Sequence, residues 1–209
     1  MIEVNTACSI VIVGGWNRKI LTPPWLGKNI FKKDELELQF PLDPSLPLKV
    51  SDKESYTIDI SNDKLMFQPL SLSDENLIIM AEAAKLVLEI LPHTPVTAMG
   101  INFGFKEETP QTELLNYLDN VLVPSHREIS DDKKCQAISI VKSYQLTGLL
   151  QNRVLNFKIH REVDEPAVIF DLNFHKEVDN AAVACEALRP ETLLSVHSYS
   201  IDLLKNFNI

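Results

Sequence analysis

The sequence predicts an α+β fold in which antiparallel strands form one sheet and two long helices pack against it. Two observations lead to this prediction. Apolar and polar residues alternate over 56–67 and again over 155–174, with a turn inside each stretch, as in a hairpin with one buried face. Each hairpin is followed by apolar residues at helical spacing, first over 73–91 and later over 190–204.

The order of the elements repeats, which indicates two similar halves. A strand, a short helix that begins at a Thr-Pro pair, further strands and a long helix occupy 7–91 and then 96–207. We interpret 1–94 and 95–209 as an N-terminal and a C-terminal α+β half of one intimate, pseudo-symmetric unit, because neither half alone buries much apolar area. Identity between the halves is negligible, so the alternative is an unrelated α+β order that only looks repetitive.

The first half opens with a nearly continuous apolar run at 7–13, which we interpret as a strand buried on both faces and ended by a glycine pair. The Thr-Pro pair at 22–23 predicts a short helix, because threonine caps exposed N–H groups and proline suits the first turn. A strand is expected at 36–40. Three prolines between 41 and 47 predict an irregular connection to the hairpin.

The long helix at 73–91 has the clearest boundaries. Ser73 is a good N-cap, two acidic residues follow it in the first turn, and Pro92 ends the helix. In the second half we expect a strand at 96–105 and a short helix from the Thr-Pro pair at 109–110. We expect a polar loop at 124–134 and a strand at 137–144 before the second hairpin.

The hairpin at 155–174 is the longest alternating stretch and is predicted to be the spine of the sheet. Leu155, Phe157, Phe170 and Leu172 should be almost fully buried. The stretch 178–188 fits either an alanine-rich loop or a short helix, and Pro190 begins the last helix.

Composition excludes several classes of protein. The 209 residues carry a net charge of −9, which opposes nucleic-acid binding because that binding depends on phosphate neutralisation by lysine and arginine. No apolar run is long enough to span a bilayer, and no signal peptide is expected. Cys8, Cys135 and Cys185 are an odd, widely spaced set, typical of reduced thiols in a cytoplasmic protein.

Motifs for catalysis are absent from the sequence. We expect no metal and no cofactor, because Cys-x-x-Cys, His-x-x-x-His and phosphate-loop patterns do not occur. His160 and His175 lie on the polar side of their predicted strands and should be solvated. Ser195 and His197 are close in sequence, yet such close neighbours on a helix point in different directions. The sequence therefore favours a non-enzymatic protein.

Four short stretches resemble a widespread family of prokaryotic α+β proteins that have no assigned activity. They are Tyr56-Thr57-Ile58, Gly100-Ile101-Asn102-Phe103, Glu113-Leu114-Leu115-Asn116 and Ile169-Phe170-Asp171-Leu172. This resemblance implies an α+β fold and no site residue. The layout is also similar to the duplicated saddle of TATA-binding-protein-like domains, but a likeness of fold does not establish function.

One stretch is rich in the residue types of binding hot spots. Both tryptophans, Trp16 and Trp25, lie within 15–26 together with Arg18 and two prolines. Tryptophan and arginine are enriched where proteins bind each other, so we predict a partner-binding surface formed by these three residues. The alternative is that both indoles cover the sheet beside the first helix.

The leading hypothesis is a non-enzymatic binding or regulatory protein that acts through protein contacts, with a protein partner or a second copy of the chain. The alternative is a small apolar ligand-binding protein with a pocket between sheet and helices, lined by Phe103, Phe157 and Phe170. The third hypothesis is an enzyme whose site is assembled from scattered residues.

Overall fold

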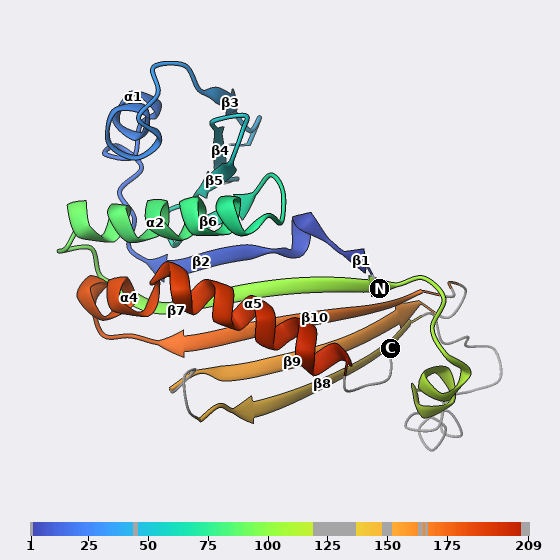
Figure 1. Ribbon diagram of the computed structural model, residues 1–209. Helices are drawn as coiled ribbons and strands as arrows, with labels where there is room; N and C mark the ends of the chain where they lie inside the picture. Colours follow the sequence, from blue (N-terminus) through green and yellow to red (C-terminus); the bar gives the residue numbers. More distant parts are fainter. Residues whose placement is uncertain are drawn as a thin grey trace.

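The computed structural model describes residues 2–43, 46–118, 137–147, 152–162, 165 and 167–205. They form an α+β fold with one ten-stranded antiparallel sheet, as the sequence predicts. The strands run in the order β3-β4-β5-β6-β2-β7-β10-β9-β8, and β1 also pairs with β7. Figure 1 shows helices α2, α4 and α5 on one face of this sheet.

The strands have these bounds: Ile2–Glu3 (β1), Ser9–Gly14 (β2), Glu37–Gln39 (β3), Leu48–Ser51 (β4), Tyr56–Ile60 (β5), Lys64–Pro69 (β6), Val96–Glu107 (β7), Ala137–Gln145 (β8), Val154–Glu162 (β9) and Val168–Glu177 (β10). The helices are Pro23–Leu26 (α1), Asp74–Ile90 (α2), Ala181–Ala187 (α4) and Pro190–Lys205 (α5). A 3-10 turn at Asn5–Ala7 (η1) precedes β2, and a π turn at Gly27–Phe31 (η2) continues α1. Residues 112–118 are also helical.

The two halves of the chain meet at the centre of the sheet. β2 pairs antiparallel with β7, with Ile10 opposite Ile101 and Ile12 opposite Met99. Outward from this pair the order is β2-β6-β5-β4 on one side and β7-β10-β9-β8 on the other, so the last strand of each half lies next to the first. This shared order agrees with the predicted duplication, although duplication itself stays a prediction.

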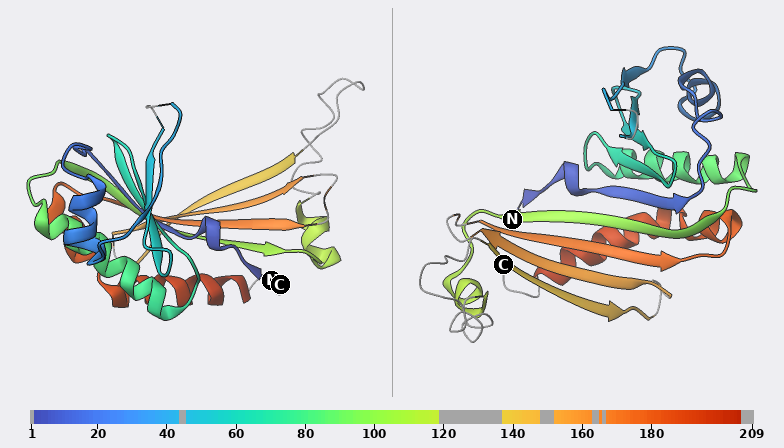
Figure 2. Two further views of the ribbon diagram at one scale, coloured as in Figure 1. Left: turned by 90° about the horizontal axis from the view of Figure 1, so that it is seen from above. Right: turned by 180° about the vertical axis from the view of Figure 1, so that it is seen from behind.

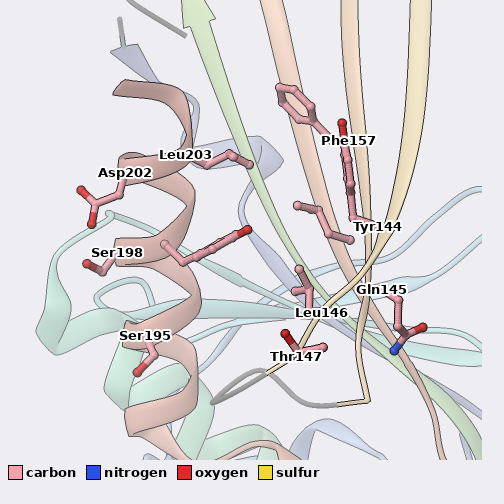
Figure 3. A pocket seen from close by; sticks show the side chains of 11 residues that line it. Tyr144, Gln145, Leu146, Thr147, Phe157, Ser195, Ser198, Asp202 and Leu203 are labelled. Atoms are coloured by element: carbon pink, nitrogen blue, oxygen red, sulfur yellow. The ribbon is translucent and has the colours of Figure 1, made fainter. Parts of the chain in front are cut away.

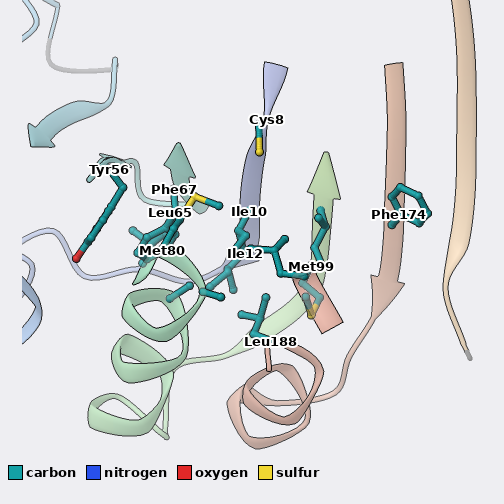
Figure 4. Close-up of a cluster of buried hydrophobic side chains, with 14 of the residues drawn as sticks. Cys8, Ile10, Ile12, Tyr56, Leu65, Phe67, Met80, Met99, Phe174 and Leu188 are labelled. Carbon is teal, nitrogen blue, oxygen red and sulfur yellow. The ribbon is translucent and has the colours of Figure 1, made fainter. Parts of the chain in front are cut away.

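Among the described residues, helices cover one face of the sheet. Ile12 is fully buried under the helices, whereas Val13 beside it is 39% exposed, so the expectation that this strand is buried on both faces is wrong. Figure 4 shows Phe67, Met99 and Ile12 grouped with Met80 of α2, and all four are buried. Figure 2 shows the strong twist of the sheet and, from behind, its open face in front of α5. Such one-sided burial is common in antiparallel sheets.

Local signals set the ends of the helices. The hydroxyl of Ser73 accepts a hydrogen bond from the Asn76 N–H at the start of α2, as its capping role predicts. The side chain of Asn180 accepts the Val183 N–H in the same way, which makes the ambiguous stretch at 178–188 a helix, α4. Thr22 stands at the N-cap of α1, but its side chain forms no capping hydrogen bond.

Two short strands were not expected from the sequence. β4 lies in the stretch that follows the predicted proline-rich connection, and β1 pairs with the far end of β7. Phe40, expected in a strand, lies beyond β3 and is 70% exposed. The predicted loop at 124–134 lies outside the described residues. The predicted strand at 137–144 and the predicted hairpin are confirmed as β8, β9 and β10.

Gly14 is required by a close approach at the end of β2. The pairing register between β2 and β7 shifts after Val13, and a Cβ atom on Gly14 would lie 2.5 Å from the Pro95 carbonyl oxygen. A side chain there would force the two central strands apart. The glycine pair therefore allows β2 and β7, which connect the two halves, to lie close together.

The hairpin β9–β10 supplies the predicted core. Leu155, Phe157, Phe170 and Leu172 are each no more than 2% exposed, and the rings of Phe157 and Phe170 lie 6.2 Å apart in a stacked arrangement. The hairpin is the spine of one half rather than of the whole sheet, since the centre is the β2–β7 pair.

Phe170→Ala removes a fully buried ring, and we expect the free energy of unfolding to fall by about 3–5 kcal/mol. Urea unfolding followed by circular dichroism measures the change. Phe40→Ala is the matched control, because loss of an exposed ring should change stability by less than about 0.5 kcal/mol. A loss below about 1 kcal/mol for Phe170→Ala would contradict its place in the core.

Asp52 fixes the turn between β4 and β5. Its Oδ1 accepts the backbone N–H groups of Glu54, Ser55 and Tyr56 at 3.0, 2.8 and 3.2 Å, and Lys33 Nζ lies 3.8 Å from Oδ2. Burial of the carboxylate acts to raise its pKa, but these hydrogen bonds and the lysine outweigh burial, so the pKa of Asp52 is lowered.

A lowered pKa in the folded state means that the ionised Asp52 stabilises the fold above the unfolded-state pKa of about 3.9. This stabilisation is lost as the pH falls through the lower folded-state pKa. Asp52→Asn should lose about 1–3 kcal/mol at pH 7, because the amide is a weaker acceptor for three N–H groups. Urea titrations at pH 7 and at pH 3 should show the gap between wild type and variant shrinking on acidification; an equal gap at both values would disprove the role.

Candidate functional site

A groove of about 850 Å³ lies between α5 and the outer strands β8 and β9. It is open to solvent along one side. Figure 3 shows Leu203 of α5 across from Phe157 and Tyr144 of the sheet. The lining residues come from three segments: Tyr144, Gln145, Leu146 and Thr147; Leu155 and Phe157; Ser195, Ser198, Tyr199, Asp202 and Leu203.

The last helix forms the groove because it carries two different stripes at helical spacing. One stripe is buried in the core: Leu193, Val196, His197, Ser200 and Leu204. The other stripe borders the groove: Ser195, Ser198, Tyr199, Asp202 and Leu203. The first stripe fixes the helix on the sheet, and the second leaves a mostly polar wall above β8 and β9.

The floor of the groove is apolar and its rim is polar. Leu155 and Phe157 project from β9 and are 1% and 2% exposed. Tyr199 of α5 packs edge-on against Phe174, with the ring centroids 6.0 Å apart. Tyr144 of β8 remains 44% exposed. Such a site suits an apolar side chain or a small apolar molecule held by a few polar contacts.

β8 forms one edge of the sheet beside this groove. Among the described strands it pairs only with β9. The Leu146 N–H donates to the Arg153 carbonyl, so the N–H groups of the even-numbered residues point toward β9. The N–H groups of Ser139, Val141 and Ser143 therefore point away from β9. Natural edge strands usually prevent pairing with another chain by charged residues, proline or bulges.

β8 carries few of these protective features. Its nine residues contain no proline and one charged residue, Lys142. The Lys142 Nζ donates to Tyr117 Oη at 3.1 Å and lies 5.8 Å from the centre of that ring. The hydrogen bond to Tyr117 is the main reason why the pKa of Lys142 is raised. Val141, on the other side of the strand, is 59% exposed.

A polar ladder crosses five strands on the open face of the sheet and ends at β8. Ser143 Oγ donates to Asn156 Oδ1 at 2.7 Å, and the Asn156 amide donates to Asn173 Oδ1 at 3.2 Å. The Asn173 amide donates to Asn102 Oδ1 at 2.6 Å, and the Asn102 amide donates to Ser9 Oγ at 2.9 Å. Every donor points toward the centre of the sheet, so Ser143 Oγ keeps only acceptor capacity at the edge.

Other polar groups are held inside the protein and serve packing. His197 Nε2 lies 2.6 Å from Glu3 Oε1, and its ring stacks on Phe103. Arg153 donates to the Ala187 carbonyl at the end of α4, and burial lowers the pKa of Arg153 to about 10. Burial raises the pKa of the Cys8 thiol to about 12, which keeps it protonated.

The three residues of the predicted partner-binding surface differ in burial. Trp16 is 3% exposed, and its indole N–H donates to the Ile12 carbonyl at 3.1 Å, so Trp16 is a core residue and presents no face to a partner. Trp25 is half-buried against the core beside α1. Arg18 is half-exposed. A partner-binding role for Arg18 and Trp25 stays a prediction.

The predicted histidines are on the open face and do not form a metal site. His160 and His175 alternate with buried residues of β9 and β10, as expected, but both are half-buried rather than solvated, and among the described residues the buried Nδ1 atom of His160 has no hydrogen-bond partner. Within the described ranges, no three side chains of the histidine, cysteine or acidic type lie close enough to hold a metal ion.

The sequence predicts a pocket between sheet and helices with Phe157 in its lining, but not its position beside β8 or the polar residues of α5 that form its wall. Ser195, Ser198 and Asp202 look like a solvated helix face, and their position opposite Phe157 depends on how α5 crosses the sheet. The only sequence signal is that Tyr199 and Leu203 lie among these polar residues, beside the buried stripe.

No family model, curated protein or solved structure matches this chain. In the part of the chain that the structure describes, no helix has the length and apolarity needed to cross a bilayer.

The two tryptophans should respond differently to substitution. Trp16→Ala should lower the free energy of unfolding by about 3–5 kcal/mol, because it removes a buried ring and its hydrogen bond. Trp25→Ala should leave the fold intact and, if Trp25 is a contact residue, weaken assembly by about 2 kcal/mol. Urea unfolding and partner titration measure the two effects. Equal losses of stability in both variants would assign Trp25 to the core as well.

Proposed function

We propose that this is a non-enzymatic binding protein that acts through protein contacts, and that its binding site is the β8 edge with the adjoining groove. The observation that supports this most directly is an edge strand with outward-pointing N–H groups beside a groove of about 850 Å³. A partner segment in extended form would add to the sheet as a further strand.

Each part of the site has a separate role in this mode of binding. The backbone groups of Ser139, Val141 and Ser143 pair with the backbone of the added strand, and this supplies affinity for any sequence. Alternate side chains of the added strand point to the helix side of the sheet, where Tyr144 and Leu203 border the groove. The groove therefore selects among partner sequences.

The polar groups add a second element of selection. Ser143 Oγ offers an acceptor on the open face, so a hydroxyl or amide donor opposite it is favoured. On the helix side, the Ser198 hydroxyl lies near the rim, and Ser195 Oγ, which donates to the Glu191 carbonyl, keeps acceptor capacity. A partner with an apolar residue for the groove and a short polar donor for Ser143 fits both faces.

A small apolar ligand is the second candidate occupant. The buried floor formed by Leu155 and Phe157 and the volume of the groove support it. Of the three phenylalanines expected in such a pocket, Phe157 lines the groove, whereas Phe103 and Phe170 do not. This ligand would use the groove without the β8 edge.

Three further expectations belong to the proposal. The sparse cysteines favour a cytoplasmic protein, and Cys8 and Cys185 are both free thiols. The net charge of −9 argues against duplex DNA as the partner. Arg18 and Trp25 provide a second, smaller contact surface near α1.

Two variants separate protein binding from ligand binding. Val141→Lys adds a charge to the edge on the open face and should abolish capture of strand partners, because a second lysine opposes edge pairing. Ser198→Trp fills the groove and leaves the edge backbone unchanged. A protein partner should be lost in both variants, whereas a small ligand should be lost only in Ser198→Trp.

Affinity capture from native lysate, with mass spectrometry of proteins and small molecules, provides the readout. Gln39→Lys is the matched control, because it places the same charge on β3 at the opposite edge of the sheet. Capture that survives in both Val141→Lys and Ser198→Trp would rule out the proposed site. Circular dichroism of each bait confirms that the variants fold.

A further inference from the structure

We infer that the β8 edge binds a second copy of the chain, with the two β8 strands antiparallel across a two-fold axis at Val141. This inference rests on the proposed function, since it names the partner of the same edge. The result is one continuous sheet shared by two protomers. Backbone geometry, hydrogen-bonding capacity and charge each favour this register.

The backbone groups of β8 match those of a second β8. The N–H groups of odd-numbered residues point outward, and antiparallel pairing requires outward-pointing residues to face each other. With the axis at Val141, Val141 lies opposite its copy and Ser139 lies opposite Ser143 of the second protomer. Both are pairs of outward-pointing residues, so the strands exchange hydrogen bonds along their overlap. A two-fold contact of this kind is closed and forms a dimer, not a fibre.

The polar ladder has a complementary end in the second copy. Ser143 Oγ donates its proton to Asn156 and can only accept a further hydrogen bond. Ser139 lies on the same face of β8, is exposed, and carries a hydroxyl donor. In the register centred on Val141, each Ser139 hydroxyl faces a Ser143 oxygen, so the ladders of the two protomers join through two such contacts.

Charge distinguishes this register from its neighbour. With the axis at Val141, Lys142 lies opposite Ile140 of the second copy. With the axis at Lys142, the two lysines lie directly opposite each other, which destabilises a cross-strand pair. β8 has no acidic residue, so Lys142 is the only charged side chain that a second β8 strand would bring to the pair.

Side chains on both faces of β8 add contact area that the paired backbones alone lack. A pair of nine-residue strands is about 30 Å long and buries less than the roughly 800 Å² per partner of a standard interface. In this register Ile140 of one protomer lies opposite Lys142 of the other, on the helix side and next to Tyr144 at the end of its groove, and Val141 becomes covered. We therefore expect a dimer with a Kd in the micromolar range, about 10⁻⁶ M.

Sedimentation equilibrium tests the dimer. The wild-type protein should pass from the mass of one 23.6-kDa chain to that of two as its concentration rises through the micromolar range. Val141→Lys should remain a monomer throughout, with the dissociation constant raised at least tenfold, and Gln39→Lys should dimerise like wild type. A wild-type protein that is monomeric up to 100 times the expected Kd, about 10⁻⁴ M, overturns the inference.

Cysteine cross-linking tests the register, in a background with Cys135→Ser and Cys185→Ser; Cys8 is buried and is retained. Opposed residues in a hydrogen-bonded pair have Cα atoms about 5.5 Å apart, within the range of a disulfide. Under mild oxidation, Val141→Cys should cross-link to itself. Ser139→Cys and Ser143→Cys should cross-link only when mixed. Cross-linking of Ser143→Cys alone, without that of Val141→Cys, overturns the register.

The two proposals can fail separately. A monomeric wild-type protein whose captured partners are lost in Val141→Lys leaves the edge as a protein-binding site and removes the second copy as its partner. A monomeric wild-type protein whose captured partners are retained in Val141→Lys removes both.

Discussion

The antiparallel pairing of β2 with β7 is the contact on which the rest of the structure depends. It is the only strand contact between the two halves along the main order of the described sheet. It also fixes which face is covered, because Ile10, Ile12 and Met99 all point to the helices. The buried stripe of α5 must then lie over the second half. Its other stripe is left above β8 and β9, and the groove follows from this arrangement.

Elements with strong local signals could be predicted from the sequence, and elements that depend on distant partners could not. The hairpins, the Ser73 cap and the long helices follow from periodicity and capping within a few residues. β1 and β4 are too short for alternation to identify, and each is defined by a neighbour far along the chain. Phe40 continues an alternating pattern in the sequence, but β3 ends before it and Phe40 lies in the connection to β4.

The candidate site was predicted poorly because residue type does not fix exposure. Trp16 is of a residue type that is enriched in binding hot spots, but its indole N–H donates to the Ile12 carbonyl and its ring packs in the core. Ser195, Ser198 and Asp202 look like an ordinary solvated face, and only the crossing of α5 over the sheet makes them a wall. The asparagines of the ladder could be placed on the polar side of their strands, but their alignment depends on the register between strands.

The contact between Glu3 and His197 has a consequence for how the protein is made. During synthesis the first strand, Ile2–Glu3, has no pairing partner until residues 105 and 106 leave the ribosome. The Glu3 carboxylate cannot contact His197 until that residue, 194 positions later, has also been translated. The N-terminal segment therefore completes its contacts only after His197 has been translated, and nascent chains that end before residues 105 and 106 must carry that segment undocked.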